Sequence, residues 1–480
     1  MNFEYDARQA NAEALAYVRK QSLDIYNRLH SIQEDVRFVL QVHQAYPSLP
    51  VLPNLRCGAW YVDPSIATND PAYFKSTDGH FGNWSFNLRR PNLHLLPVII
   101  ANGGAILVDS TRAGKRIPDA LSKTVPIWCA VINRAMAIMH PDKEDWDAEL
   151  YCPPASVSEQ ERVQIKARIE EWAVALTKSA YTIPPLPLPL RPLWITPATS
   201  GFPRLPDRAD LAYLPILCVS ASRQVEDGLE RRSHGFAYVQ GSGDDHELWG
   251  MGLTPDIFWA NKERLLRSTR EQLPSVVEEV VAAAKDSGVR ENWNRSPTPI
   301  IAVDGRLLIS AVPDMPANLP ATLPGTQYST SYVVISADVV SAQESDHAGT
   351  TSSPQNALRL KMAEGKKDQL HFLQSVLPES MQYIKARLAK GDAVCVCCDT
   401  GRDASVGVAL AALQLFFDEK GKLLLENDGA TRTPQAHANK TSIKTRLQWI
   451  ISSRPEANPS RVTLKRVNEF LLSPPSFRRK

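Results

Sequence analysis

Apolar residues recur three or four positions apart in several stretches before residue 290, and this spacing predicts amphipathic helices. One such helix is predicted over residues 22–45 and another over residues 276–285. A third begins after Ser158, because Glu161 follows at the spacing of a capping box and apolar residues then continue on one face. Helices with one apolar face are expected to pack on a larger core.

Short continuous apolar runs lie between these helices and predict buried strands. The clearest strands are expected at 105–110, 215–222 and 236–245. We interpret residues 54–64 and the apolar run around Pro97 as further short strands in irregular chain. The proline-rich segment 183–206 is interpreted as a connection laid over a domain surface.

Strands and helices are predicted to alternate again after the polar segment 290–299. Strands are predicted at 305–312, 332–340 and 393–398, and helices at 369–388 and 405–417, followed by basic C-terminal helices. Alternating strands and helices are typical of the α/β class. We therefore predict two α/β domains, residues 1–295 and residues 296–480.

The composition is that of a folded protein, with 43% hydrophobic and 22% charged residues among 480. Seven cysteines without regular spacing, and an opening segment without an apolar core, predict a reducing compartment, the cytoplasm with the nucleus as a second location. The most apolar stretch, 93–108, is interrupted and shorter than the ~20 residues of a membrane span. We therefore expect no membrane association.

Residues 393–417 form the sharpest local pattern, an apolar strand followed by a short loop and an apolar helix. The loop amides and the helix N-terminus, which carries about half a positive charge, would converge on one point and favour a phosphate there. Arg402 would add a planar cation. An ordinary strand-to-helix turn is the alternative, but the crowding of cysteine, threonine, arginine and serine favours an anion site.

This loop resembles two known phosphate-binding motifs. Cys398, Gly401 and Ser405 match the Cys-x-x-Gly-x-x-Arg-Ser/Thr loop of dual-specificity phosphatases. Ala404 stands where that motif has its arginine, so the resemblance implies phosphate binding without the clamp that phosphoryl transfer needs. The loop is also loosely similar to the ribose 5-phosphate loop of phosphoribosyltransferases, at Asp399, Thr400, Gly401 and Ser405.

Charge is distributed unevenly, although the chain as a whole carries only +2. Residues 75–134 hold eight Lys or Arg against three Asp, with several hydroxyls and with Trp84 and Phe86 available to stack on bases. Residues 440–480 hold ten Lys or Arg against two Glu. A solvated face is the ordinary interpretation of each charge taken singly, but the first cluster suits several phosphates. Its main cations are Lys75, His80, Arg89, Arg90, Arg112, Lys115, Arg116 and Lys123.

A third candidate is the glycine-rich segment 239–255, in which Asp244 and Asp245 precede a histidine and a glutamate. Two adjacent carboxylates could hold a Mg²⁺ bound to pyrophosphate, or supply a general base for a hydroxyl. An exposed acidic turn is the alternative, and the sequence does not decide between them.

Long segments of the chain carry a resemblance to one family. They include YNRLHSIQEDVRFV, VDSTRAGKRIPDALSKTVPIWCAVIN, YVQGSGDDHELWGMGLTPDIFW, CCDTGRDASVGVALAALQLFFD and RPEANPSRVTLKRVNEFL. Nearly end to end, the chain resembles the eukaryotic initiator-tRNA 2'-O-ribosyl phosphate transferases. The resemblance implies transfer of a phosphoribosyl unit from phosphoribosyl pyrophosphate to the 2'-hydroxyl of a T-stem purine nucleotide in initiator methionine tRNA, which keeps that tRNA out of elongation. It also implies a family-specific N-terminal domain and a C-terminal domain like a dual-specificity phosphatase.

The implied reaction sets the expected roles. Breaking the bond between C1 and pyrophosphate builds negative charge on the leaving group, which calls for cations and Mg²⁺. We expect the diphosphate and nearby RNA backbone at Lys75, Arg112, Lys115 and Arg116, and the metal or the general base at Asp244 or Asp245. The 5-phosphate is expected at Cys398, Asp399, Thr400, Gly401, Arg402, Asp403, Ala404 and Ser405, with Asp399 and Arg402 as catalytic residues and Cys398 as a wall residue.

The remaining expected contacts are with tRNA, at Arg89, Arg90, Lys440, Lys444, Lys465 and Arg466. Two other functions compete with phosphoribosyl transfer. One is a phosphatase for RNA or phosphoproteins that uses Cys398, against which Ala404 argues. The other is a tRNA-binding protein without catalysis, in which the loop is only a phosphate reader.

Overall fold

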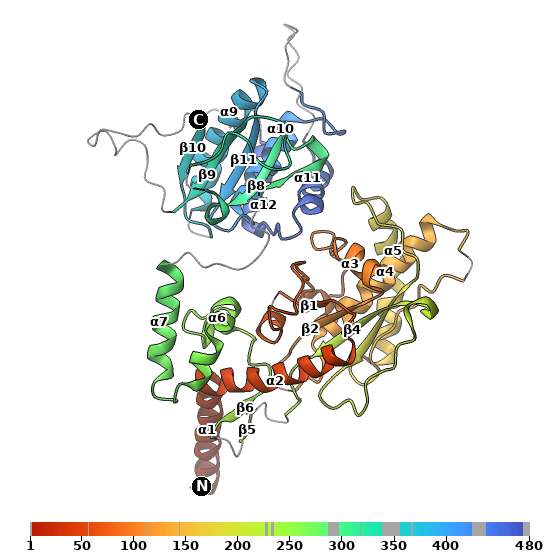
Figure 1. Ribbon diagram of the computed structural model, residues 1–480, viewed down its shortest axis with the longest axis vertical. Helices are drawn as coiled ribbons and strands as arrows, with labels where there is room; N and C mark the ends of the chain where they lie inside the picture. Colours follow the sequence, from red (N-terminus) through yellow and green to blue (C-terminus); the bar gives the residue numbers. More distant parts are fainter. Residues whose placement is uncertain are drawn as a thin grey trace. The chain divides into compact units, whose positions relative to one another are not determined.

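The computed structural model describes residues 2–55, 57–112, 114–143, 145–225, 229–231, 235–286, 297–316, 318–337, 356–365, 368–424 and 438–473. The chain divides into two compact units. Unit 1 comprises Met1–Lys178 and Ile183–Trp293, and unit 2 comprises Ser179–Thr182 and Asn294–Lys480. The predicted boundary at 295/296 lies close to this division, in the segment 287–296 outside the described residues. Figure 1 shows the elements of both units.

Unit 1 is built on a four-stranded parallel sheet in the order β1-β2-β4-β3. Its strands are β1 (Val51–Pro53), β2 (Ala105–Asp109), β3 (Leu190–Ile195) and β4 (Leu214–Ser220). Strands β2 and β4 are buried along their whole length, as expected for a parallel sheet that is covered on both faces. Strands β5 (Leu229–Arg231) and β6 (Ala237–Val239) follow β4 in the sequence and form a separate two-stranded antiparallel sheet.

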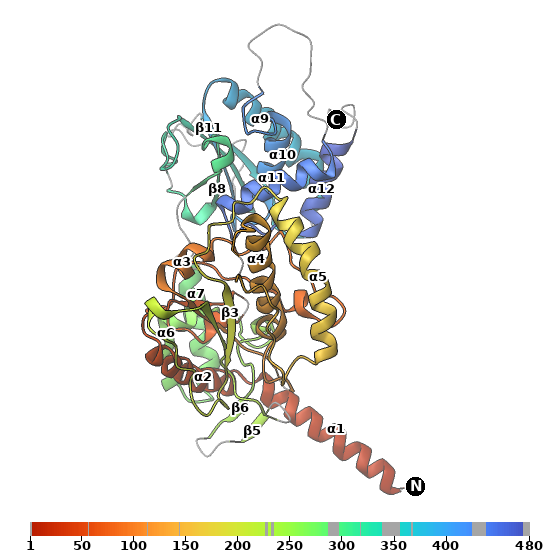
Figure 2. The ribbon, with the colours of Figure 1, turned by 90° about the vertical axis from the view of Figure 1, so that its right-hand side faces the viewer.

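Helices cover both faces of this sheet. The helices of unit 1 are α1 (Asn2–Leu23), α2 (Ile25–Ala45), α3 (Leu95–Asn102), α4 (Val125–Met139), α5 (Glu159–Thr177), α6 (Pro255–Arg267) and α7 (Leu273–Asp286). Of these, α1 projects away from the sheet and contacts α2 and β5 (Figure 2). Apolar residues of α2, α6 and α7 share one core with Ile106 and Leu217 of the sheet. Figure 2 shows α4 and α5 side by side across the sheet from α2. Unit 1 is therefore a three-layer α/β/α domain.

Unit 2 contains a five-stranded sheet in the order β10-β9-β11-β8-β7, in which only β7 is antiparallel to its neighbour. The strands are β7 (Thr298–Pro299), β8 (Leu307–Ala311), β9 (Thr330–Ser336), β10 (Ala357–Lys361) and β11 (Ala393–Cys398). Its helices are α8 (Gln369–His371), α9 (Leu377–Ala389), α10 (Ala404–Phe416), α11 (Lys440–Ser453) and α12 (Arg461–Leu472). Helix α10 is almost wholly buried and packs on β11, α9, α11 and α12. The central strand β11 leads directly into the loop before α10.

Most predicted elements are confirmed, and the α/β class with them. The cap at Ser158 is present, since its hydroxyl accepts a hydrogen bond from the Glu161 N–H at 3.2 Å. Of the strand predicted at 332–340, residues 338–340 lie outside the described residues. Three assignments were wrong. Residues 54–64, predicted as a short strand, form an isolated bridge at Asn54, turns and the 3-10 turn Gly58–Trp60 where they are described. The run around Pro97 is helix α3, because a proline in the first turn removes no helical hydrogen bond.

The third wrong assignment concerns the proline-rich connection, which contains strand β3. Pro192 lies inside this strand, where a ladder hydrogen bond would normally be lost. Strand β3 is the edge of the sheet, and an edge strand tolerates proline because its N–H has no partner to lose on the open side.

Candidate functional site

Polar side chains gather where the parallel strands of unit 1 end. Asn54 follows β1, Asp109 is the last residue of β2, Thr196 follows β3 and Ser220 is the last residue of β4. All four are buried. Because parallel strands end at one edge of the sheet, these side chains share that edge, which is where open α/β sheets bind their ligands.

Asp109 is held rigidly at the centre of this edge and is only 2% exposed. Its carboxylate accepts hydrogen bonds from the Asn54 side-chain amide at 2.8 Å, the Cys57 thiol at 2.8 Å and the Ser110 N–H at 2.9 Å. Burial raises the pKa of Asp109 to about 6 in spite of these donors. Asp109 therefore orients the turn after β2 rather than reaching solvent.

A second buried carboxyl group enters from helix α2. Asp35 accepts hydrogen bonds from the Ser222 hydroxyl at 2.5 Å and the Tyr238 hydroxyl at 2.7 Å. Ser222 in turn lies 2.6 Å from the Ser110 hydroxyl. Burial raises the pKa of Asp35 to about 8, so this acid keeps its proton near neutral pH. The network ties α2, β6 and the ends of β2 and β4 together.

The cations predicted after β2 form an edge segment, residues 112 and 114–119, across these strand ends. The Arg112 Nε donates to Asp244 Oδ2 at 2.8 Å, and its guanidinium also pairs with Asp245. The Lys115 carbonyl accepts from the Gln240 amide at 2.6 Å, which fixes the middle of the segment. Two regions that are far apart in the sequence, the second and third candidates, thus belong to one site.

Close backbone contact explains how the two regions meet. Gly241 has a φ of +67°, and a Cβ on it would lie 2.4 Å from the Thr111 carbonyl oxygen. The loop that follows is held by Arg28, which donates to the Ser242 carbonyl at 2.9 Å, and by the Tyr61 hydroxyl, which accepts from the Gly243 N–H at 2.7 Å. Only glycine satisfies both the backbone angle and the contact at position 241.

Cations also surround Asp119 at the far end of the edge segment. Lys115 contacts its carboxylate at 2.5 Å, Lys123 at 3.1 Å and His80 at 3.8 Å. Burial alone would raise the pKa of Asp119, but the hydrogen bonds and charges of Lys115 and Lys123 lower this pKa below its ordinary value. Lys123 is itself buried and contacts Glu161 at 3.2 Å. This group is a fixed, charge-balanced support.

The aromatic expectation for this region was wrong in one respect. Trp84 is buried, and its indole N–H donates to Glu161 Oε1 at 2.9 Å, so its ring does not face solvent. Phe81, which sequence reasoning overlooked, is 71% exposed. It packs edge-to-face on Trp84 with ring centroids 5.5 Å apart.

The other predicted cations of unit 1 are less open. Arg90 is mostly buried and makes an ion pair with Asp78 at 2.8 Å, so its guanidinium is engaged within the fold. Arg89 and Lys75 are partly buried. Arg116 is exposed, and its carbonyl accepts from the Ser220 hydroxyl at 3.0 Å. Arg112, Lys115 and Arg116 are therefore the predicted phosphate ligands that reach solvent most fully.

In unit 2, the loop between β11 and α10 is closed by a carboxylate. The Ala404 N–H, at the first turn of α10, donates to Glu364 Oε1 at 3.2 Å. Cys398 is fully buried and its thiol donates to the Ser405 hydroxyl at 3.0 Å. Burial and the Glu364 carboxylate raise the pKa of Cys398 to about 12, so the thiol is protonated near neutral pH. A nucleophilic thiolate needs the opposite environment.

The rest of this loop is fixed by its neighbours. Gly401 has a φ of +66°, and its carbonyl accepts from Arg454 Nε at 3.0 Å. The Asp403 carboxylate accepts from the Ser460 N–H at 2.8 Å, and the Arg402 N–H donates to the Thr400 hydroxyl at 3.2 Å. Arg454 was counted with the basic C-terminal run, but it is buried and structural.

The basic C-terminal helices divide into exposed and engaged cations. Lys440 and Lys444 are exposed on α11. Lys465 and Arg466 on α12 both contact Glu469, at 3.9 Å and 2.6 Å. Three further basic residues of the run lie in 474–480, outside the described residues.

Two family models match the chain. One, described as the Rit1 N-terminal domain, matches residues 18–282, and the other, described as the Rit1 DUSP-like domain, matches residues 356–471. The chain belongs to the Rit1 family. The predicted family and the phosphatase-like C-terminal domain are both confirmed by these matches.

Relatives of this Rit1 chain cover almost its whole length. It is 33% identical to the tRNA A64-2'-O-ribosylphosphate transferase of Saccharomyces cerevisiae, over 95% of this chain and 93% of that protein. It is 35% identical to an uncharacterised protein of Schizosaccharomyces pombe, over 96% and 97% of the two chains. Among solved structures, human DUSP28 is 16% identical over 36% of this chain and 92% of that chain, with a TM-score of 0.24.

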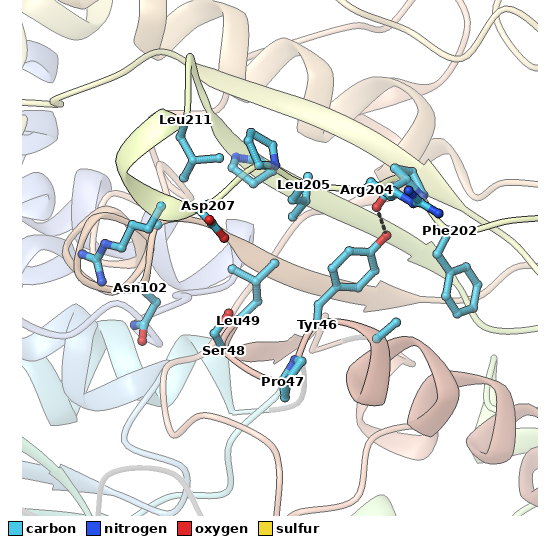
Figure 3. A pocket seen from close by; sticks show the side chains of 16 residues that line it. Tyr46, Pro47, Ser48, Leu49, Asn102, Phe202, Arg204, Leu205, Asp207 and Leu211 are labelled. Atoms are coloured by element: carbon cyan, nitrogen blue, oxygen red, sulfur yellow. Dashed lines mark hydrogen bonds between the residues drawn. The ribbon is translucent and has the colours of Figure 1, made fainter.

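A pocket of about 560 Å³ in the Rit1 N-terminal domain lies at the opposite edge of the sheet (Figure 3). It is lined by residues that precede the strands, among them Tyr46 before β1, Gly103 before β2 and Leu211 before β4. The Tyr46 hydroxyl donates to the Pro203 carbonyl at 2.6 Å and closes one side. None of the predicted site residues lines this pocket, so the candidate chemistry remains at the carboxyl edge.

Over the part of this Rit1 chain that the structure describes, no three His, Cys, Asp or Glu side chains gather as metal ligands. Asp244 and Asp245 nevertheless supply two adjacent carboxylates. Mg²⁺ is commonly bound through one or two carboxylates together with substrate phosphates and water, so these residues fit such an ion. In the same described part, every helix is too short or too polar to cross a bilayer.

Proposed function

We propose that this protein transfers a 5-phosphoribosyl group from phosphoribosyl pyrophosphate to the 2'-hydroxyl of a T-stem purine nucleotide in initiator methionine tRNA, marking that tRNA against use in elongation. The observation that carries the proposal is the 33% identity, across 95% of the chain, to the yeast protein named tRNA A64-2'-O-ribosylphosphate transferase. We place the reaction in a reducing compartment, the cytoplasm with the nucleus as a second location.

The edge segment supports the donor half of this proposal. Arg112 and Lys115 are 63% and 55% exposed, and both are anchored by carboxylates at the edge of a rigid parallel sheet. Cations that are fixed before the reaction stabilise charge on a leaving diphosphate without further reorganisation. We therefore assign the diphosphate to Arg112, Lys115 and Arg116, with Lys75 as a further contact.

Mg²⁺ would be held by Asp244 and Asp245, and when bound it would neutralise part of the diphosphate charge. The carboxylates now pair with Arg112, so they and the guanidinium already form one polar cluster of two negative charges and one positive charge. Donor phosphates would take over part of the contact that Arg112 makes with the two acids. The cluster is suited to this exchange because Arg112 is largely exposed.

The loop at 398–405 remains a proposed site for a substrate phosphate, with Asp399 and Arg402 beside it. Its support is the N-terminus of α10, where backbone N–H groups favour an anion. The Glu364 carboxylate already accepts the Ala404 N–H, so a phosphate would have to displace it. For the RNA backbone we propose the exposed Lys440 and Lys444, with Arg89, Arg90, Lys465 and Arg466 as secondary contacts.

Phosphate hydrolysis through Cys398 is less well supported than transfer. The thiol is buried and protonated, and Ala404 supplies no guanidinium to the loop. A tRNA-binding protein without catalysis would need the same cationic surfaces but no donor site. Neither the phosphatase nor the binding protein would attach a group covalently to the tRNA, so a covalent product distinguishes transfer from both.

The test is incubation of the full chain with initiator or elongator methionine tRNA, Mg²⁺ and phosphoribosyl pyrophosphate that carries a labelled 5-phosphate. We expect label in initiator tRNA, and its loss in Arg112→Gln. Arg134→Gln is the matched control, because Arg134 is an exposed, carboxylate-paired arginine on α4 away from the strand ends. Retention of tRNA without covalent label would instead indicate a binding protein, and turnover of p-nitrophenyl phosphate would indicate a phosphatase.

A further inference from the structure

A histidine and an exposed phenylalanine lie next to each other beside the edge segment of unit 1. His80 is 49% exposed and follows the short 3-10 turn Ser76–Gly79, which packs on the turn Ala120–Thr124. Phe81 comes directly after it and is 71% exposed. Lys115 of the edge segment and His80 contact the same carboxylate, that of Asp119. The pair therefore borders the proposed diphosphate cations.

The Phe81 ring is supported from within the fold. It packs edge-to-face on Trp84, and the indole N–H of Trp84 donates to Glu161. Glu161 also holds Lys123, so the support is continuous with the group around Asp119. A phenylalanine this exposed, on a fixed base and beside cations, has the character of the aromatic platforms on which unpaired bases stack.

A carboxylate lies close to the His80 ring. Its Nε2 lies 3.8 Å from Asp119 Oδ2, which is longer than a hydrogen bond, so it is the charge of the carboxylate that favours the proton on Nε2 and leaves Nδ1 with its lone pair. Asp119 is the charged group that faces the ring, and Lys115 and Lys123 hold that carboxylate in place. Such a pair has the arrangement of a general base and its orienting acid.

The other acids at this edge are less suited to accept a proton from a substrate hydroxyl. Asp35 and Asp109 are buried and hydrogen-bonded within the fold. Asp244 and Asp245 both pair with Arg112. His80 is more exposed than any of these four, and unlike Asp244 and Asp245 it lies beside a carboxylate rather than the Arg112 guanidinium.

We propose that His80 and Phe81 form the acceptor-nucleotide subsite, in which Phe81 stacks on a base of the RNA and His80 takes the proton of the attacking 2'-hydroxyl. The inference rests on the proposed function. The hydroxyl oxygen forms a bond to C1 of the donor ribose while the bond from C1 to the diphosphate oxygen breaks. The electron pair leaves with the diphosphate, and the hydroxyl proton moves to His80 Nδ1 and then to solvent.

The first experiment measures transfer to initiator tRNA by His80→Ala with and without added imidazole. We expect kcat to fall by roughly 10²- to 10⁴-fold with KM for tRNA nearly unchanged, and imidazole to restore part of it, since the half-exposed position leaves room for a small base. His371→Ala is the matched control, because His371 is an exposed histidine of unit 2. Rescue by imidazole does not occur where a histidine is merely structural. Unchanged kcat, or a loss that imidazole does not restore, overturns the role of His80.

The second experiment tests the platform. Phe81→Ala should raise KM for tRNA by roughly ten- to a hundredfold with a smaller effect on kcat, and Phe81→Trp should restore it because any aromatic face stacks on a base. Leu370→Ala removes another exposed apolar side chain and should have no effect. Equal KM in Phe81→Ala and the parent overturns the platform. If the parent protein itself transfers no label, the proposed function fails, whereas transfer that ignores both substitutions refutes only this subsite.

Discussion

Substitution of Asp35 by asparagine probes the buried network that fixes the carboxyl edge of unit 1. Burial raises the pKa of Asp35 to about 8 in the folded protein, against about 3.9 for an exposed aspartate. Between these values the folded state holds one more proton than the unfolded state. The free energy of unfolding therefore falls as pH rises through this window and levels off above the folded pKa.

The magnitude follows from linkage. One extra proton in the folded state changes the free energy of unfolding by about 1.4 kcal/mol per pH unit, so Asp35 removes about 3 kcal/mol between pH 5 and pH 7. Asparagine is uncharged like the protonated acid, and its carbonyl oxygen can accept from the Tyr238 hydroxyl as the carboxyl group does. Its amide would meet the Ser222 hydroxyl, which donates to Asp35 in the parent and can turn its donor toward Ser110 instead. Asp35→Asn should thus cost little at pH 5 and gain about 3 kcal/mol relative to the parent by pH 7.

Urea unfolding of the full chain, followed by tryptophan fluorescence at pH 5, 6 and 7, measures this difference. Nine of the ten tryptophans precede residue 294, so the signal reports mainly on unit 1. The raised pKa of Asp109, also in unit 1, contributes to both proteins and cancels in the comparison. A difference between variant and parent that stays constant with pH, or grows in the opposite direction, would refute a protonated Asp35.

Two further outcomes follow from local geometry. Gly241→Ala should lower the free energy of unfolding by about 2 kcal/mol or more in urea unfolding, because it combines a positive φ with a contact at 2.4 Å. Gly391→Ala, with a φ of +88° and open space around it, should cost less, and equal losses would contradict the contact. Cys398 should resist alkylation by iodoacetamide at pH 7 in the folded chain, since burial raises its pKa to about 12. Rapid labelling at this position without denaturant would show that the thiol is open.

The sequence predicted correctly those features of the fold that depend on residues within one short segment. The cap at Ser158 and the apolar strands at the centres of both sheets are set by residues close in the chain. Strand β3 was not predicted, because Pro192 argues against a strand in the local sequence. The proline is tolerated only because β3 is at the edge of the sheet, which the local sequence does not reveal. Pairing partners far apart in sequence, such as Arg112 and Asp244, leave no spacing pattern at all.

One overlooked residue did leave a local signal. Asp35 lies three residues after Ile32 and four before Val39, inside the apolar stripe of α2. An acid in that position must either break the packing or find buried partners, and here it finds Ser222 and Tyr238. A charged residue on the buried face of a predicted helix is thus a better pointer to a site than the same residue in an exposed run.

The motif that is easiest to recognise and the groups best placed for chemistry lie in different units. The loop at Cys398 matches part of the dual-specificity phosphatase motif in sequence, but its thiol is protonated and the Glu364 carboxylate accepts the Ala404 N–H. In unit 1 no short motif stands out, yet strand ends, cations and carboxylates meet at one edge, and Arg112 and Lys115 remain exposed there. A phosphorylated donor arrives from solvent, so the cations that bind it must be exposed. Reactivity should therefore respond to substitutions at the edge segment more strongly than to any change at Cys398.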